Sequence, residues 1–335
     1  MYLLAPTGFG QLADRANWFK SPIARRLRDE KGVEFGFELK GEAETIIKNP
    51  GLFWGYHIPT NFAEEYFYHP ERREKLVKSL LPISKLKPNY VNVHGPKLWW
   101  KPEKKDYIKR YEVHSDPEEF FKLLSVTIDL IKNLQEIFPQ LTLENNTLVD
   151  YYRRDKDFLP ITSFQPSAGG MLENFYIKEK TGVKFLVDIE HLILCLNFLN
   201  RKKNYADLKN KKFLQTPKEK ELEKIFGYKI KKGYIPYTDP ELNFEKIIQK
   251  MDAKRYHVTG NDQDVISGEK DLSHGPIKKD NLTFRKHLKI VLKQKPESIL
   301  VETANCSDNA CFSHLKPNET EFSFYNLCQI LLEEL

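Results

Sequence analysis

Histidine and carboxylate side chains recur in this sequence where short apolar segments end. A histidine closes the segments Gly-Tyr-His, Asn-Val-His and Arg-Tyr-His, and a glutamate closes Leu-Thr-Leu-Glu and Leu-Val-Glu. Imidazole and carboxylate groups bind zinc, iron and manganese, so this repetition predicts a metal centre. The nine candidate ligands are His57, His94, Glu144, Asp188, His191, His257, Asp271, His274 and Glu302.

The prediction depends on the number of these residues, because a single histidine at a strand end is more often structural. Five of the nine histidines in the chain belong to the pattern, together with four carboxylates. Crowding so many ionisable groups without a cation is costly through repulsion and desolvation. Nine ligands exceed what one tetrahedral or octahedral ion needs, so we expect two or three divalent ions with bridging carboxylates.

The elements that must position these residues are short strands that alternate with helices. Eight segments rich in β-branched and aromatic residues predict strands, and seven segments with helical periodicity lie between or after them. Such alternation predicts a (β/α)8 TIM barrel, in which the carboxyl ends of all strands meet on one face. No clear helix is predicted between the fifth and sixth strands. The strands are expected at 2–9, 33–39, 52–59, 90–96, 141–145, 183–188, 255–259 and 298–302, and the helices at 12–28, 62–80, 118–137, 189–199, 241–251, 283–292 and 319–335.

Length and composition are consistent with one folded barrel domain over residues 1–335. Hydrophobic residues make up 40% and charged residues 30% of the chain, which excludes a disordered or low-complexity protein. No apolar run approaches the roughly 18 residues of a membrane span, and no leader precedes the first strand, so we expect a cytoplasmic protein. The four cysteines form no Cys-x-x-Cys pair and are expected to be reduced structural thiols.

A basic helical insertion at residues 201–233 interrupts the barrel pattern between the sixth and seventh strands. Residues 201–232 carry twelve Lys and Arg against four Asp and Glu, a local charge of +8 in a chain whose net charge is +6. A segment of this kind is either a contact for a polyanion such as nucleic acid or a solvated surface with charges of both signs.

The order of the candidate ligands resembles that of the xylose isomerase-like TIM-barrel superfamily, and the complete set resembles the endonuclease IV family within it. That resemblance spans residues 2–302 and implies a zinc-dependent apurinic/apyrimidinic endonuclease of DNA repair, with three ions held by the nine ligands. Manganese and iron are alternatives to zinc. The sugar isomerases and epimerases of the same superfamily bind a single metal ion with the smaller set that matches Glu144, Asp188, His257 and Glu302.

The chain departs from the endonuclease IV pattern at three places. It has Asp271-x-x-His274 where that family has Asp-x-His, and His94-Gly95-Pro96 where the family has His-Pro-Gly. Residues 146–150 replace the glycine-rich sequence that follows Glu-Asn in the nuclease. The metal ligands are therefore expected to persist, while the substrate stays open.

Phosphodiester hydrolysis is the leading hypothesis, with DNA or another phosphodiester as the substrate. Glu144 is expected to bridge two ions that Glu302 helps to hold, and both glutamates are the candidate catalytic residues. His57 and His94 are expected on the more exposed ion, and the other ligands on the deeper ones. Nucleic acid is expected to contact the basic side chains of Lys211, Lys212, Lys231 and Lys232 and to stack on the rings of Tyr56, Phe62, Tyr66, Trp99 and Trp100.

Two other functions fit the same residues. In a sugar isomerase or epimerase with one Mn²⁺, Mg²⁺ or Co²⁺ ion, Glu144 and Glu302 face each other across the substrate and pass protons to and from the carbon beside the carbonyl. His57, His94, Asp271 and His274 bind no metal under that hypothesis. A barrel that binds a ligand without catalysis is the third alternative, although so many ionisable groups in one cluster are costly without chemistry.

Overall fold

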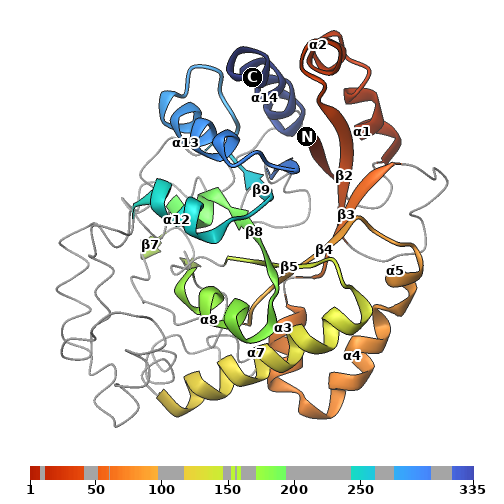
Figure 1. The fold of residues 1–335 in the computed structure, drawn as a ribbon, viewed down its shortest axis with the longest axis vertical. Helices are drawn as coiled ribbons and strands as arrows, with labels where there is room; N and C mark the ends of the chain where they lie inside the picture. The colour runs from red at the N-terminus through yellow and green to blue at the C-terminus, as the bar shows by residue number, and fades with distance from the viewer. Residues whose placement is uncertain are drawn as a thin grey trace.

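Eight parallel strands form a closed barrel, as the sequence pattern predicts (Figure 1). The computed structural model describes residues 1–7, 12–40, 52–59, 61–96, 117–145, 152–154, 157–159, 171–193, 243–260, 275–302 and 319–335. Around the barrel the strand order is β1, β2, β3, β4, β5, β8, β9 and β10, and β10 pairs with β1 to close the ring. The strands are β1 (Tyr2–Thr7), β2 (Glu34–Lys40), β3 (Phe53–His57), β4 (Tyr90–His94), β5 (Leu141–Glu144), β8 (Lys184–Asp188), β9 (Arg255–Val258) and β10 (Ser298–Val301).

Helices surround this barrel, and the C-terminal helix packs mainly against α2, the second helix after β1 (Figure 1). Among the described residues, helices lie in the connections β1–β2, β3–β4, β4–β5, β5–β8, β8–β9 and β9–β10, which are the crossovers that parallel strands require. The helices are α1 (Leu12–Trp18), α2 (Pro22–Lys31), α3 (Phe62–Tyr68), the 3₁₀ turn η2 (Pro70–Arg72), α4 (Arg73–Ser79), α5 (Leu81–Lys85), α7 (Pro117–Ile137), α8 (Met171–Thr181), α12 (Phe244–Met251), α13 (Leu282–Lys293) and α14 (Glu319–Glu334).

Two helices that the sequence predicts as continuous are broken in the structure, and local chemistry explains each break. Residues 12–28 divide into α1 and α2 because Ser21 caps a new helix by accepting a hydrogen bond from the amide of Ala24, with Pro22 at the first position. Residues 62–80 divide where Pro70 begins the turn η2. The helix predicted at 241–251 begins at Phe244, because the Asn243 side chain accepts from the amide of Lys246.

The segment between the fifth and sixth strands contains elements that the sequence pattern did not predict. Helix α8 lies there, and its apolar residues are spread around the helix, which conceals the amphipathic period. A short antiparallel pair, β6 (Tyr152–Arg154) with β7 (Asp157–Leu159), precedes it. The expected rhythm of strand, helix and strand therefore continues through this part of the barrel.

The two faces of each strand have different roles. Outward side chains such as Leu3, Val91 and Val187 pack with the helices in the main hydrophobic core. Inside the barrel, a small apolar cluster lies nearer to the amino ends of the strands. Further along the same strand faces, toward the carboxyl ends, the buried side chains are polar and ionisable. The cluster inside the barrel consists of Leu4, Phe53, Tyr90, Leu186 and Leu300.

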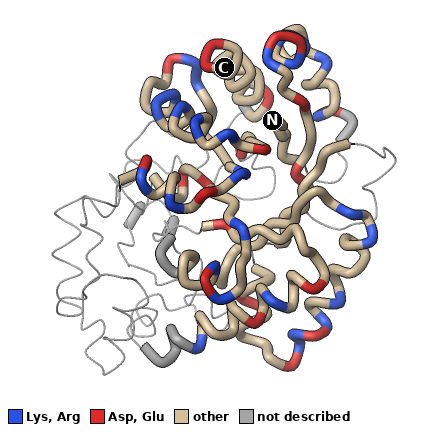
Figure 2. The backbone as a smooth tube through the Cα atoms, viewed as in Figure 1, with Lys and Arg blue, Asp and Glu red and all other residues tan. Residues whose placement is uncertain are grey.

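Lysine, arginine and carboxylate side chains are interspersed along the outer helices (Figure 2). The described part of the chain therefore shows charges of both signs on helices such as α2 and α12. Residues 201–233, the basic insertion expected from the sequence, lie outside the described residues. Among the helices that the structure describes, none has the length and apolar character needed to cross a membrane.

Stability below neutral pH is expected to depend on His287 of α13. Its ring lies 4.3 Å from the ring of Phe244, and burial, with a contribution from Lys286, lowers its pKa from 6.5 to about 4. Between these pH values the imidazole of His287 is protonated in the unfolded chain and neutral in the folded chain. The free energy of unfolding therefore falls as the pH drops from 6.5 toward 4. Thermal unfolding at pH 7 and pH 5 should show a smaller loss for His287→Leu than for the wild type. The partly exposed His69, changed in the same way, is the control, and equal losses in all three proteins would contradict this role.

Candidate metal centre

Six of the expected ligands lie at the carboxyl ends of barrel strands, where the strand register places them beside one another. His57 and His94 end β3 and β4, and Glu144 ends β5. Across the ladders, His94 is paired with Glu144, and Asp188 is paired with His257. Glu302 follows β10 directly, and its amide donates to the carbonyl of Val258 on β9. Residues far apart in the sequence therefore meet in one buried layer above the apolar cluster.

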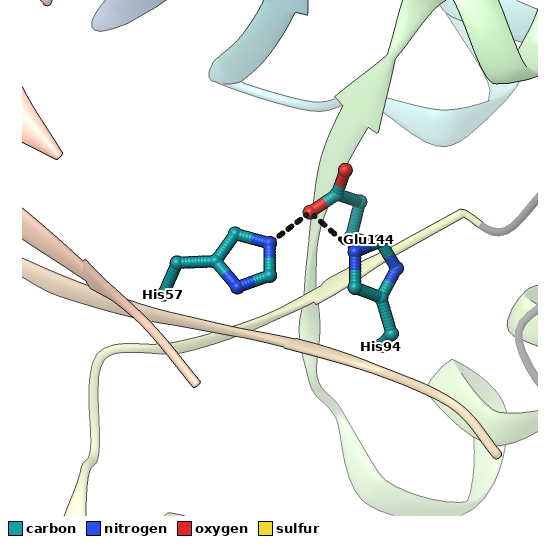
Figure 3. Close-up of side chains that lie close together, drawn as sticks. All are labelled: His57, His94 and Glu144. Carbon is teal, nitrogen blue, oxygen red and sulfur yellow. Dashed lines mark ion pairs between the residues drawn. The ribbon is translucent and has the colours of Figure 1, made fainter. Parts of the chain in front are cut away.

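The first ligand group consists of His57, His94 and Glu144 from three successive barrel strands (Figure 3). The Nε2 atoms of His57 and His94 lie 3.2 and 3.4 Å from the same carboxylate oxygen, Oε2 of Glu144. All three residues are buried, with Glu144 fully inaccessible to solvent. Each residue offers one ligand atom within 4.8 Å of the others, a separation that one ion could bridge.

The second ligand group contains Glu144 again, together with Asp188, His257 and Glu302. The Nδ1 atom of His257 lies 3.2 Å from Oε1 of Glu144 and 2.6 Å from Oε2 of Glu302. Glu144 therefore presents Oε2 to the first group and Oε1 to the second, in the manner of a bridging carboxylate. Two neighbouring cations sharing one carboxylate would use every residue of both groups.

The unsatisfied polar atoms of the cluster fit bound cations. Among the described residues, Nε2 of His57, Oε1 of Glu144 and Nδ1 of His257 are buried without a hydrogen-bond partner of acceptable geometry. Buried polar atoms without partners are costly, and these three belong to the two ligand groups that Glu144 joins. The donor set of imidazole and carboxylate suits zinc, manganese or iron. The residues present therefore fit a divalent metal centre.

The electrostatics of the cluster also favour a cation. Burial opposes ionisation of Glu144, but the facing His94 and His257 outweigh it and hold the pKa of this carboxyl well below its usual value. Burial likewise opposes the charge on His257, yet Glu38, Glu144 and Glu302 raise the pKa of its imidazole. Positive charge on its neighbours thus favours the ionised form of Glu144, and a bound cation would supply such charge as well.

Asp188 and His191 are held by the backbone around them. Oδ1 of Asp188 accepts hydrogen bonds from the amides of Glu190 and His191, so this carboxylate caps the helical residues 189–193 that follow β8. The Asn145 side chain bonds to the amide and the carbonyl of Asp188, and Nδ1 of His191 lies 2.8 Å from the carbonyl of Asn145. His191 stands beside the second group, with Nε2 at 3.6 Å from Oδ2 of Asp188.

Polar residues that the sequence analysis did not select complete the layer. Asn92 donates to Oε2 of Glu144, Lys40 pairs with Glu302 at 2.8 Å, and the fully buried Glu38 faces His257. A signal for Glu38 existed, since a glutamate interrupts the otherwise apolar run of β2. It was missed because only residues at strand ends were considered.

The structure does not place every expected site residue at this centre. Tyr56, Phe62 and Tyr66 are buried in the core between strands and helices, where a base could not stack on them, so their expected role in nucleic-acid binding is dropped. The other expected ligands and contacts lie outside the described residues: Asp271, His274, Trp99, Trp100, Lys211, Lys212, Lys231 and Lys232.

Comparison with known proteins finds a relative in structure only. The chain is similar to the solved structure of an L-ribulose 3-epimerase, with a TM-score of 0.51 and 10% sequence identity, covering 100% of this chain and 94% of that chain. No family model matches the sequence, and no curated protein matches it. At this identity the similarity shows the (β/α)8 barrel fold and leaves the activity to be argued from the site.

Proposed function

We propose that this chain is a divalent-metal-dependent enzyme of the xylose isomerase-like type, with its site at the carboxyl ends of the barrel strands. The observation that carries the proposal is the buried group Glu144, Asp188, His257 and Glu302, whose ligand atoms lie within 4.8 Å of one another. A bound divalent ion would polarise substrate oxygens and lower the pKa of a bound water. The number of ions is proposed together with the reaction: one ion for isomerisation, and two or three, with zinc first, for phosphodiester hydrolysis.

Isomerisation or epimerisation of a sugar is the reaction with the broader support. The four-ligand group is the set that a single-metal enzyme of this kind needs, and the similar solved structure is named as an L-ribulose 3-epimerase. Glu144 and Glu302 both approach His257, so two carboxylates are available beside a substrate carbon. One carboxylate would remove the proton next to the carbonyl, and the other would return a proton to the enediol.

Phosphodiester hydrolysis is the second candidate, and one observation favours it. The group His57, His94 and Glu144 offers three more ligand atoms, which a single-metal isomerase does not require. Glu144 joins this group to the other one, and two-metal sites of this kind hold both the attacking and the leaving oxygen of a phosphate ester. Lys40, whose side chain is 43% exposed, supplies a positive charge beside Glu302. DNA is one substrate of this class.

Metal counting on the purified protein tests the proposal and separates the two reactions. We expect at least one tightly bound transition-metal ion for each chain, and a protein that binds none on titration would overturn the proposal. For hydrolysis, a second ion should be present and should be lost in the double variant His57→Ala, His94→Ala. For isomerisation, that variant should keep its single ion. His69→Ala, a change to a partly exposed histidine outside the site, is the matched control.

Activity measurements complete this test. The wild type and both variants are assayed on a panel of ketoses and on a duplex with one abasic site. Epimerase chemistry predicts turnover of a ketose by the wild type, and also by the double variant because that variant keeps the single ion. Hydrolysis predicts strand cleavage that falls with the second ion, by about 10³-fold for several kcal/mol of lost metal assistance.

A further inference from the structure

A row of three residues crosses the inside of the barrel below the metal centre. Glu38 on β2 is paired with Gly55 on β3, and Gly55 is paired with Tyr90 on β4. Glu38 and Tyr90 are therefore two strands apart, yet the Tyr90 hydroxyl donates a hydrogen bond of 2.8 Å to Oε2 of Glu38. Both side chains are fully buried. Strand β3 lies between them, so its residue at this level must leave room for the tyrosine ring.

Gly55 provides that passage because it has no side chain. A Cβ atom at this position would lie 2.1 Å from Cζ of Tyr90 and 2.3 Å from its Cε1, well inside contact distance. The tyrosine ring thus lies directly over the glycine backbone. The guanidinium of Arg255 also stacks on the tyrosine ring, 4.9 Å from the ring centre, and is itself held by Glu297 at 2.7 Å. Gly55, Arg255 and Glu38 therefore all contact the Tyr90 side chain.

Glu38 connects this row to the metal centre on the other side of the barrel. The oxygen that accepts from Tyr90, Oε2, also lies 3.0 Å from Nε2 of His257. Because Oε2 already accepts the hydroxyl hydrogen of Tyr90, this oxygen faces Nε2 as a hydrogen-bond acceptor. A hydrogen bond to such an acceptor requires the proton on Nε2. The other ring nitrogen, Nδ1, is then the one directed at Glu144 and Glu302.

We propose that Tyr90 and Glu38 are positioning residues, which hold the His257 ring so that Nδ1 serves as the metal ligand. The proposal rests on the metal-dependent function proposed above. Carboxylates that accept from the outer nitrogen of a metal-bound histidine fix its orientation and raise its strength as a ligand. Here the carboxylate is in turn fixed by a tyrosine from two strands away. Both side chains are fully buried, and their contacts lead to the centre through His257.

Two variants test this role. Glu38→Gln keeps the size of the side chain and removes its charge, and we expect zinc affinity to fall by roughly 10-fold to 100-fold. Tyr90→Phe removes one hydroxyl, and a smaller loss of roughly fivefold is expected, the size of one hydrogen bond. The control is Tyr256→Phe, because this hydroxyl is also buried but donates to the carbonyl of Ala253, away from the centre. Affinity is measured by zinc titration of the purified full chain.

A second readout reports on the ring itself. In the wild type, the Nε2 proton of His257 should give a downfield, slowly exchanging NMR signal in metal-free and zinc-loaded protein. Glu38→Gln should shift that signal upfield and speed its exchange, while Tyr256→Phe should leave it unchanged. If Glu38→Gln fails to fold, Tyr90→Phe provides both measurements.

The possible results separate the two proposals. A wild type that binds no zinc overturns the proposed function, and the ring signal of the metal-free protein still tests the positioning role. A wild type that binds zinc, with folded variants that match it in affinity and ring signal, overturns the positioning role alone.

Discussion

Replacing Glu144 by glutamine is expected to empty both ligand groups and to lower activity by about 10³-fold. This carboxylate is the single residue common to the two groups, and each of its oxygens faces a different one. An amide offers one neutral oxygen, so it cannot supply a charged ligand to both sides. The loss of several kcal/mol of metal assistance corresponds to about three orders of magnitude in rate.

Metal content and turnover are measured together on this variant. Glu30→Gln is the matched control, since it changes an exposed carboxylate that pairs with Arg26 on the outer helix α2, away from the cluster. The control should keep both metal and activity. A Glu144→Gln protein with its full metal complement would show that the carboxylate is not shared between ions.

Replacing Gly55 by alanine is expected to destabilise the barrel by about 3 kcal/mol, the upper end of the usual cost of overfilling a core. The added methyl group would meet the ring of Tyr90 at 2.1 Å, and that ring has no free space because it is enclosed by the barrel. Either the strand or the tyrosine must move. The change is measured as a shift in the denaturant midpoint of unfolding.

A double variant identifies the cause of this loss. If the clash with Tyr90 is responsible, Gly55→Ala combined with Tyr90→Ala should cost less than the sum of the single changes. Gly32→Ala is the control, because a Cβ at this position meets no atom within 4 Å and strain arises only from its left-handed φ of 64°. A loss of about 1 kcal/mol is expected there. Additive costs at Gly55 and Tyr90 would contradict the packing explanation.

Much of the architecture was predictable because strand periodicity and ligand placement agree in this chain. All eight expected strands are present in the barrel, within a few residues of their predicted ends. A period of two places Leu186 and Asp188 on the same inner face, and Leu300 and Glu302 likewise. Polar residues at strand ends could therefore be assigned to one face once the barrel was inferred.

Features that depend on distances across the barrel could not be predicted. Glu38 becomes part of the centre only because its strand register aligns it with Gly55 and because Tyr90 spans the gap. Nothing in the sequence near Tyr90 indicates a partner two strands away. The burial of Tyr56 has a different origin, since the alternation along β3 points His57 into the barrel and the ring of Tyr56 toward the helices.

The residues of the two ligand groups come from different parts of the sequence, and this has a consequence for folding during synthesis. His57, His94 and Glu144 come from three adjacent strands in the first half of the sequence, whereas the other group requires β8, β9 and β10 as well. During synthesis the early half could capture a cation as soon as three strands pair. Glu144 would then already be bound when the later strands pair, and closure of the barrel between β10 and β1 would complete the second ligand group last.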